Sequence, residues 1–259
     1  MKHWLLVVLG VAVVLSTVVE AKVIVQTVQY RQGPTLLEGV LAYKEKGPKK
    51  RPGIVLFHQK LGITAYEKMR ARQLAEEGYV VLTADIFGKD IRPTDDSQAA
   101  QEVSKYHGDR GLLRARAKAG FNFLKQFGKT DASRIAAVGY GFGGQVALEL
   151  ARSGEMVKAV VSVHGNLETP EPDEARNITA EILVEHGGDD PFVPWSEVTA
   201  FKDEMDKANV PYQLNVYSDA VHAFTIQNGS HLPATGVAYN AKADRRAWRD
   251  MILFLREIV

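Results

Sequence analysis

Short apolar runs recur along the chain and are separated by segments with a helical repeat of apolar residues. The runs are typical of strands buried on both faces of a parallel sheet, and they cover residues 53–57, 79–84, 134–138, 157–163 and 180–185. A further strand is expected at residues 212–217. The segments that predict helices cover residues 64–77, 110–127, 145–152, 196–208 and 240–258. Strands that alternate with helices predict an α/β domain whose mostly parallel sheet has helices on both faces.

The residues before the first buried run have a different pattern. Residues 23–30 and 36–43 are strand-like and flank a Gln-Gly-Pro turn, so they predict a β-hairpin. Gly47 precedes a proline, which biases it toward an extended backbone. Residues 85–98 are rich in glycine, proline and aspartate and are expected to form a loop. No repeat or linker divides the chain, so we expect residues 22–259 to form one domain.

The N-terminus has the three-part pattern of a secretory signal peptide. Residues 1–3 are a short basic start, residues 4–15 carry no polar side chain, and residues 19–21 offer a cleavage point with small residues. The apolar run is shorter than the roughly 20 residues of a transmembrane helix. We therefore expect residues 1–21 to be removed and the protein to be exported, to the periplasm or beyond. An uncleaved membrane anchor is the alternative.

Composition narrows the classes of function. The chain has 259 residues, 46% of them apolar, and a formal net charge of +1. This balance gives no electrostatic case for binding nucleic acid or, after removal of the signal, an anionic membrane surface. There is no cysteine, which excludes disulfides, thiolate catalysis and cysteine metal sites.

Chemically active residues follow the predicted strands. Because ligands of open α/β sheets bind outside the carboxyl ends of the strands, these residues are expected to meet at one edge. In chain order they are His58 and Gln59, Asp85, the glycine-rich residues 139–144, His164, His186 with Asp190, and His222.

Residues 139–144, Gly-Tyr-Gly-Phe-Gly-Gly, lie between a strand and a helix. This is the arrangement of the nucleophile elbow of α/β-hydrolases, yet the central position, Gly141, has no side chain. Asp190 and His222 follow in the order acid, then histidine, and the acid would orient the imidazole. A surface role for His222 and a helix-capping role for Asp190 are the plainer alternatives.

These motifs together resemble the dienelactone hydrolase family, from about Tyr30 to the C-terminus. The matching segments are residues 139–144, 186–194, 221–225, 236–240 and 243–248. The resemblance implies a single-domain α/β-hydrolase without a lid that acts on esters and lactones through a Cys-Asp-His triad. Asp190 matches the acid, His222 the histidine, and Gly141 the cysteine.

The resemblance also implies the surroundings of the nucleophile. Gln59 stands where the family has a glutamate that helps to control the cysteine, and His58 is expected beside it in the pocket. The backbone N–H groups of Phe142 and Lys60 match the oxyanion-hole donors. Family enzymes that bind anionic lactones use arginines, and Arg92 and Arg110 lie in or near loops that could reach the pocket.

Three functions remain open. The first is ester or lactone hydrolysis with the covalent route disabled, in which His222 activates a water above Gly141 and Asp190 orients His222. The second is a non-catalytic protein, a pseudoenzyme, that holds a small ester, lactone or carboxylate in the same pocket. The third is a metal-dependent hydrolase that uses His58, His164, His186 and His222, although no metal-binding spacing is present. No cofactor is expected.

Overall fold

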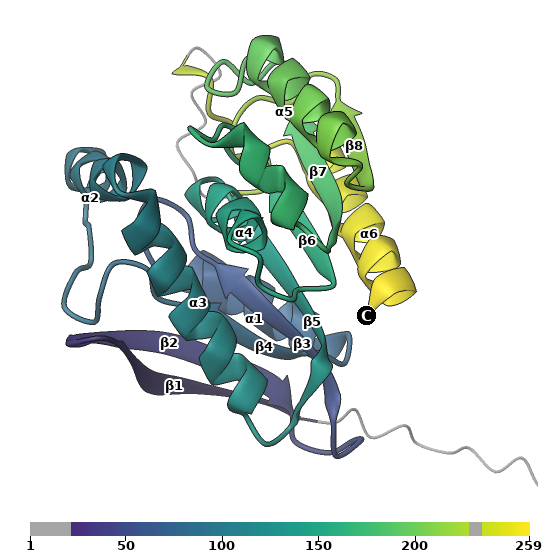
Figure 1. Ribbon diagram of the computed structural model, residues 1–259. Helices are drawn as coiled ribbons and strands as arrows, with labels where there is room; N and C mark the ends of the chain where they lie inside the picture. Colours follow the sequence, from purple (N-terminus) through teal and green to yellow (C-terminus); the bar gives the residue numbers. More distant parts are fainter. Residues whose placement is uncertain (1–21, 228–234) are drawn as a thin grey trace, which may run out of the picture.

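The fold is organised around one eight-stranded sheet in the order β1-β2-β4-β3-β5-β6-β7-β8 (Figure 1). The computed structural model describes residues 22–227 and 235–259. The strands are β1 (Val23–Gln32), β2 (Thr35–Lys44), β3 (Arg51–Phe57), β4 (Val80–Ala84), β5 (Thr130–Tyr140), β6 (Ala159–Val163), β7 (Glu181–Gly187) and β8 (Tyr212–Tyr217). From β4 to β8 in this order the strands are parallel, which confirms the predicted sheet. The hairpin of β1 and β2 is antiparallel, also as predicted.

Helices cover both faces of the sheet (Figure 1). One face carries α1 (Ala65–Glu76) and α6 (Ala241–Ile258), and the other carries α2 (Asp96–Gly108), α3 (Arg110–Gln126), α4 (Phe142–Arg152) and α5 (Trp195–Ala208). A short 3-10 helix, η1 (Pro172–Asn177), lies between β6 and β7. The alternation of strands and helices therefore gives the α/β architecture that the apolar runs predict.

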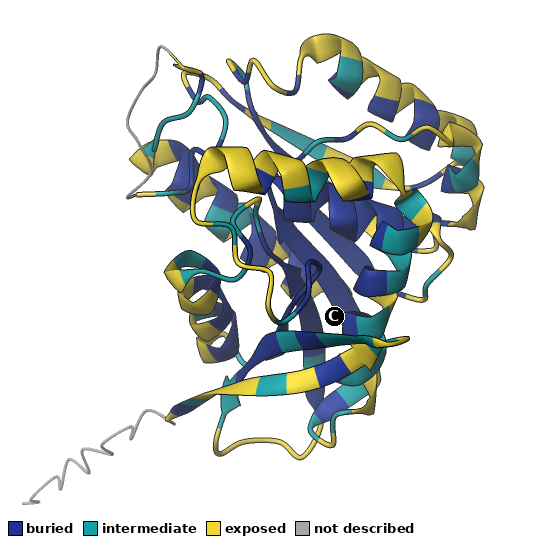
Figure 2. Ribbon diagram, turned by 90° about the vertical axis from the view of Figure 1, so that its left-hand side faces the viewer, coloured by how far each residue is buried: buried dark blue, intermediate teal, exposed yellow. Residues whose placement is uncertain are grey.

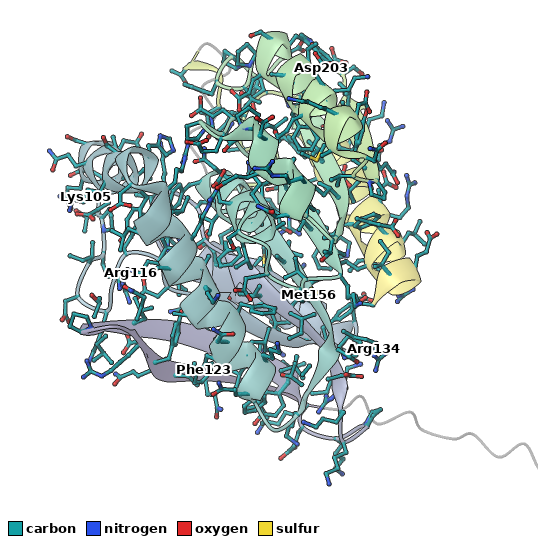
Figure 3. All side chains as sticks on the ribbon, viewed as in Figure 1. Lys105, Arg116, Phe123, Arg134, Met156 and Asp203 are labelled. Carbon is teal, nitrogen blue, oxygen red and sulfur yellow. The ribbon has the colours of Figure 1, made fainter. Side chains whose placement is uncertain are left out.

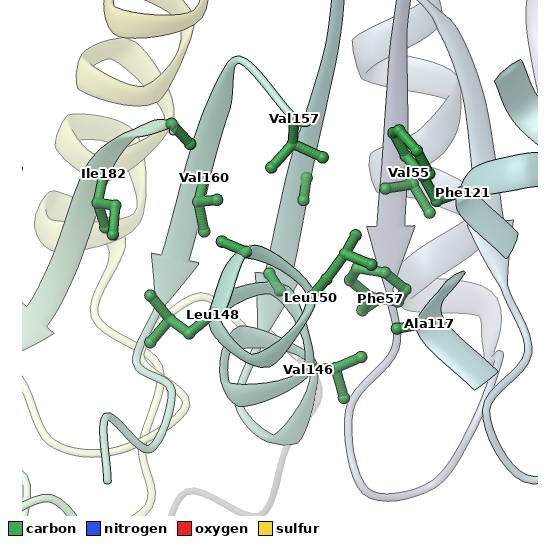
Figure 4. Close-up of a cluster of buried hydrophobic side chains, with 14 of the residues drawn as sticks. Val55, Phe57, Ala117, Phe121, Val146, Leu148, Leu150, Val157, Val160 and Ile182 are labelled. Carbon is green, nitrogen blue, oxygen red and sulfur yellow. The ribbon is translucent and has the colours of Figure 1, made fainter. Parts of the chain in front are cut away.

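The core beneath α4 positions the start of that helix. Its residues Val146 and Leu150 pack with Phe57 of β3 and Val160 of β6 in one buried cluster (Figure 4). Burying one such side chain contributes about 1.5–3 kcal/mol, so α4 is held firmly over the centre of the sheet. Figure 2 shows the sheet buried throughout its centre, with the exposed residues on the outer sides of the helices.

Helix α2 and the backbone of Gly47 depart from the predictions. The expected loop at residues 85–98 passes into α2, because Asp95 caps this helix through the N–H of Gln98 at 2.9 Å. Only Ala99 and Tyr106 of α2 are buried, so the sequence shows too weak an apolar repeat to reveal the helix. The expectation for Gly47 is wrong, because its φ is 136°, in the region that favours glycine.

No helix in the described part of the chain is long and apolar enough to cross a membrane. Charged side chains such as Lys105, Arg134 and Asp203 lie on the outer surface (Figure 3). The predicted signal peptide, residues 1–21, lies outside the described residues.

Candidate active site

The turn between β5 and α4 has the backbone of a nucleophile elbow. Gly141 has φ 54° and ψ −121°, and α4 begins at the next residue, Phe142. The N–H of Gly141 donates to the carbonyl of Val163 on β6 at 3.0 Å. A positive φ costs a residue with a side chain about 1–3 kcal/mol, so glycine relaxes this turn, as the elbow pattern predicts.

Only one of the glycines in the turn leaves room for a side chain. A Cβ atom on Gly139 would lie 1.9 Å from the carbonyl oxygen of Gly143, and one on Gly143 would lie 2.2 Å from that of Phe57. A Cβ on Gly141 would meet only ordinary contacts, the nearest being Oε1 of Gln59 at 3.6 Å. Gly139 and Gly143 thus allow close packing, whereas Gly141 marks an open position at which a side chain would fit.

An acid–histidine pair lies on the loops after β7 and β8. Nδ1 of His222 lies 2.9 Å from Oδ2 of Asp190. The other carboxyl oxygen of Asp190 accepts the N–H groups of Phe192 at 2.8 Å and Val193 at 3.2 Å. The carboxyl group is buried, while 21% of the His222 side chain is exposed. With its proton on Nδ1, donated to Asp190, neutral His222 offers Nε2 as an acceptor.

The backbone and the ring of His222 are both held in place. Its N–H donates to the carbonyl of Gly236 at 3.0 Å, and its carbonyl accepts the N–H of Ala238 at 3.3 Å. The rings of Phe192 and His164 contact the imidazole edge to face, with centroids 5.3 Å and 5.5 Å away. His222 is therefore fixed in position by its neighbours, unlike a histidine that lies free on the surface.

The two backbone N–H groups expected to form an oxyanion hole lie just after strands β5 and β3. The N–H of Phe142 is the first of α4, where the helix dipole favours negative charge, and Lys60 follows β3. Among the described residues, neither N–H donates to an acceptor. The side chain of Lys60 turns away to Asp96 on the surface, at 2.9 Å.

Gln59 lies against the open position, and a buried carboxylate holds its backbone. The N–H of Gln59 donates to Oε1 of Glu67 at 3.3 Å, and Oε2 of Glu67 accepts the N–H of Thr64 at 2.8 Å. Sequence reasoning missed this role of Glu67. The signal was present, because the Thr64–Glu67 spacing is that of a helix capping box, which the structure forms at the start of α1.

The other histidines of this edge differ in what they can do. Nδ1 of His58 donates to the carbonyl of Gln59 at 2.7 Å, and Nε2 accepts the N–H of Ile86 at 3.2 Å, so neither nitrogen is left for a ligand. Burial lowers the pKa of His58 and also that of His186, whose ring contacts Trp195. Both ring nitrogens of His58 thus support the backbone around the site, and its role in the pocket stays a prediction.

His164 was expected at this edge only as a histidine after a strand and as a ligand in the metal alternative, and its ring lies next to Gly141. Its Nε2 contacts Oγ1 of Thr225 at 2.9 Å, and its Nδ1 lies 3.9 Å from the position of a Cβ on Gly141. Burial and the nearby His222 lower the pKa of His164 well below the usual range, so the ring is neutral. No group of three or more histidine, aspartate or glutamate residues in the described part of the chain could hold a metal ion.

The two candidate arginines have other partners. Arg92 donates to the carbonyls of Gly88 and Ile91, at 2.6 Å and 2.7 Å. Arg110 lies 3.7 Å from the carboxylate of Glu168. Neither contact places these guanidinium groups at Gly141.

Known proteins show the same fold. A dienelactone hydrolase-like promiscuous phosphotriesterase from metagenomic libraries is 34% identical, with a TM-score of 0.86 over 91% of this chain and 98% of that one. A putative dienelactone hydrolase from Klebsiella pneumoniae is 20% identical, with a TM-score of 0.78 over 91% and 99% of the two chains. A probable 2-oxo-3-(5-oxofuran-2-ylidene)propanoate lactonase from Bradyrhizobium sp is 27% identical over 79% of this chain and 83% of its own.

The family model described as the dienelactone hydrolase family matches residues 37–259, which include the elbow, Asp190 and His222. The sequence resemblance, the sheet order and this match agree. The chain therefore belongs to the dienelactone hydrolase family of α/β-hydrolases.

Proposed function

We propose that this protein is an ester or lactone hydrolase in which water replaces the missing nucleophilic side chain. The observation that carries the proposal is the Asp190–His222 pair, with its 2.9 Å contact, beside an elbow whose central residue is Gly141. The pair supplies a base and the residue that orients it. The elbow supplies space and backbone donors but no atom that can form an acyl-enzyme.

The reaction would proceed by direct attack of water. Nε2 of His222 takes a proton from a water above Gly141 as the oxygen attacks the ester carbonyl, and Asp190 stabilises the imidazolium. The N–H groups of Phe142 and Lys60 bind the oxyanion. When the tetrahedral intermediate collapses, His222 returns the proton to the departing alkoxide. Without a nucleophile we expect slow turnover, because the members of a triad act as a unit.

The substrates to test follow from the relatives. The family acts on lactones and esters, one relative is named as a probable lactonase, and a solved neighbour is named as a promiscuous phosphotriesterase. A panel of aryl esters, five-membered unsaturated lactones and aryl phosphotriesters therefore covers the chemistry that these names suggest.

The second candidate is a non-catalytic protein that holds a small carboxylate or ester. It is favoured by the same backbone donors, since the N–H groups of Phe142 and Lys60 have no acceptor in the described part of the chain. Turnover that depends on His222 separates the two functions, because a binding protein needs no base.

The test is the substrate panel run on the wild-type protein and on His222→Gln. We expect slow wild-type turnover that falls to background in the variant. Ser133→Ala, an exposed change near the start of β5, at the opposite end of that strand from the elbow, is the control and should leave the rate unchanged. A wild-type rate at background, or one that His222→Gln leaves unaltered, would reject the hydrolase and leave the binding protein.

Export is a separate part of the proposal. It is supported by the basic start, the apolar run and the small residues before Lys22. N-terminal sequencing of the protein recovered from a periplasmic fraction should begin near Lys22. An intact Met1 on a membrane-bound protein would favour the anchor instead.

A further inference from the structure

A buried chain of polar side chains ends at His164. Nε of Arg70 donates to the hydroxyl of Tyr66 at 3.1 Å, and this hydroxyl contacts Oγ1 of Thr225 at 2.6 Å. Thr225 in turn contacts Nε2 of His164 at 2.9 Å. Arg70 is anchored at the far end by a salt bridge to Asp244. This series of hydrogen-bonded side chains thus links α1, the loop after β8 and the residue after β6 to the space above Gly141.

The hydrogen bonds of this network can be assigned a direction from the needs of its donors. A guanidinium only donates, so the oxygen of Tyr66 accepts from Arg70. In the contact between Tyr66 and Thr225 either hydroxyl could donate, but only donation from Tyr66 gives its buried proton an acceptor among the described contacts. The hydroxyl of Thr225 then donates its own proton to Nε2 of His164. A neutral imidazole that accepts at Nε2 carries its proton on Nδ1.

The proton on Nδ1 has no partner within the described part of the chain. His164 is 1% exposed, and its Nδ1 is buried without a hydrogen bond. Nδ1 lies 3.9 Å from the Cβ position of Gly141, and Oε1 of Gln59 lies 3.6 Å from the same position. Buried donors are rarely left unpaired in proteins, so this one indicates an acceptor that the site receives from outside.

We infer that the N–H group at Nδ1 of His164, together with the N–H groups of Phe142 and Lys60, binds the carboxylate of a small organic acid above Gly141. The donors follow three neighbouring strands, β6, β5 and β3, whose carboxyl ends lie at one edge of the sheet, and each is suited to an oxygen with negative charge. The carboxamide of Gln59 can add its NH₂ group by turning over. His164 therefore acts as a fixed donor, while His222, with Nε2 as an acceptor, acts as the base.

This inference deepens the proposed function, because a carboxylate is the acid product of ester and lactone hydrolysis. It rests on the same site but requires no turnover. A carboxylate held there would also occupy the space of the attacking water, so the acid product should inhibit the reaction competitively.

The experiment reads the tautomer of His164 and the binding of acetate in the full-length protein. Imidazole ¹⁵N shifts distinguish a nitrogen that carries a proton from one that does not, and we expect the proton on Nδ1 without added ligand. Acetate should shift the Nδ1 resonance, while acetamide, of the same shape but neutral, should bind about tenfold more weakly or worse, since hydrogen bonds to charged groups are stronger than those to neutral ones.

Three variants test the chain behind His164. Thr225→Val removes the donor to Nε2, so the proton should distribute over both nitrogens and acetate affinity should fall about tenfold. His164→Asn keeps a short amide donor and suits the φ of 41° at this position, so it should retain most of the affinity. Thr199→Val, on the exposed side of α5, is the matched control and should change neither quantity.

Two results would overturn the inference: an unprotonated Nδ1 in the wild-type protein, or acetate that leaves the His164 resonances unmoved. The wild-type spectra alone decide both, so neither result depends on the folding of a variant. A protein that binds acetate through His164 but turns over no ester would support the inference and reject the hydrolase. Ester turnover in a protein whose His164 resonances do not respond to acetate would support the hydrolase and reject the inference.

Discussion

The two sides of the site differ in what they are made of. On the side of β5 and α4, the working parts are backbone: a positive φ at Gly141 and the N–H of Phe142. On the side of β7 and β8, the working parts are the side chains of Asp190 and His222. The first side has glycine, with no side chain, at its central position, and the second side contributes two side chains.

The difference shows which features of an elbow depend on the nucleophile. The close approaches at Gly139 and Gly143 and the first N–H groups of α4 follow from the packing of α4 on the sheet. None of them requires a side chain at residue 141. The turn is therefore expected to accept a nucleophile without rearrangement, and the following predictions test how far the two sides are independent.

The largest effect is expected from Gly141→Cys. A cysteine Cβ fits the open position, and the acid, the histidine and the oxyanion donors are in place, so esterase activity should rise by about two orders of magnitude or more. Initial rates on the aryl ester panel measure it. Gly141→Ala is the matched control, because it imposes the same backbone strain without a thiol.

Adding Gln59→Glu to Gly141→Cys should change the rate again, since the carboxamide lies 3.6 Å from the new Cβ. Adding His222→Gln instead should abolish the gain. A folded Gly141→Cys protein that stays at background would show that Asp190 and His222 do not work as a pair with this elbow.

The next effect concerns pH and the side of β7. Burial raises the pKa of Glu185 to about 8, although Tyr217 and Asn215 donate to its carboxyl group. Because this pKa lies above the ordinary value of 4.5, the stabilisation is fully present below about pH 4.5 and is lost as pH rises through 8. Urea unfolding should become easier over this window, by up to a few kcal/mol.

Glu185→Gln is the variant that isolates this group, because it keeps the shape without the titration. Its stability should vary less between pH 5 and pH 9 than that of the wild type. Equal pH slopes for the two proteins would mean that Glu185 does not retain its proton in the fold.

A smaller effect is expected from Gly141→Ala on stability. Alanine at φ 54° is strained and glycine is not, while the added methyl meets only ordinary contacts, so the loss should be about 1 kcal/mol or more. Urea melts measure it. Gly128→Ala is the control, because Gly128 has no positive φ and a Cβ there would meet no atom within 4 Å. An unchanged urea midpoint for Gly141→Ala would show that glycine does not relieve backbone strain at this turn.

The last prediction is that covalent inhibitors leave the elbow unmodified. Thiol- and serine-directed inhibitors should leave the mass of the wild-type protein unchanged at residues 139–144, since Gly141 offers no nucleophilic atom and the chain has no cysteine. Intact-mass spectrometry followed by peptide mapping tests this. An adduct on the elbow would contradict it, and Gly141→Cys serves as the positive control.

The sequence predicted those parts of the site that follow from chain order. The elbow, Asp190 and His222 each follow a buried strand, and parallel strands bring their carboxyl ends to one edge. The strands and the larger helices were predictable for a similar reason, because an apolar repeat is a local property. Helix α2 was missed because it buries little.

The chain behind His164 was not predictable, because its contacts are remote in the sequence. Tyr66 and Thr225 are 159 residues apart, and His164 and Thr225 are 61 apart. No spacing motif encodes such pairs. His164 therefore stood in the sequence only as one histidine after a strand, and its contact with Thr225 emerged only with the tertiary structure.

The room around Gly141 also has a consequence for how such a protein can change over generations. The glycine codons GGU and GGC are one base away from codons for cysteine and for serine. The neighbouring glycines are fixed by packing, while this one is free to gain a side chain. Where its codon is GGU or GGC, a single point mutation separates the present form from one with a thiol or hydroxyl at the elbow. Such a mutation would change the chemistry at the elbow while leaving the packing of α4 on the sheet as it is.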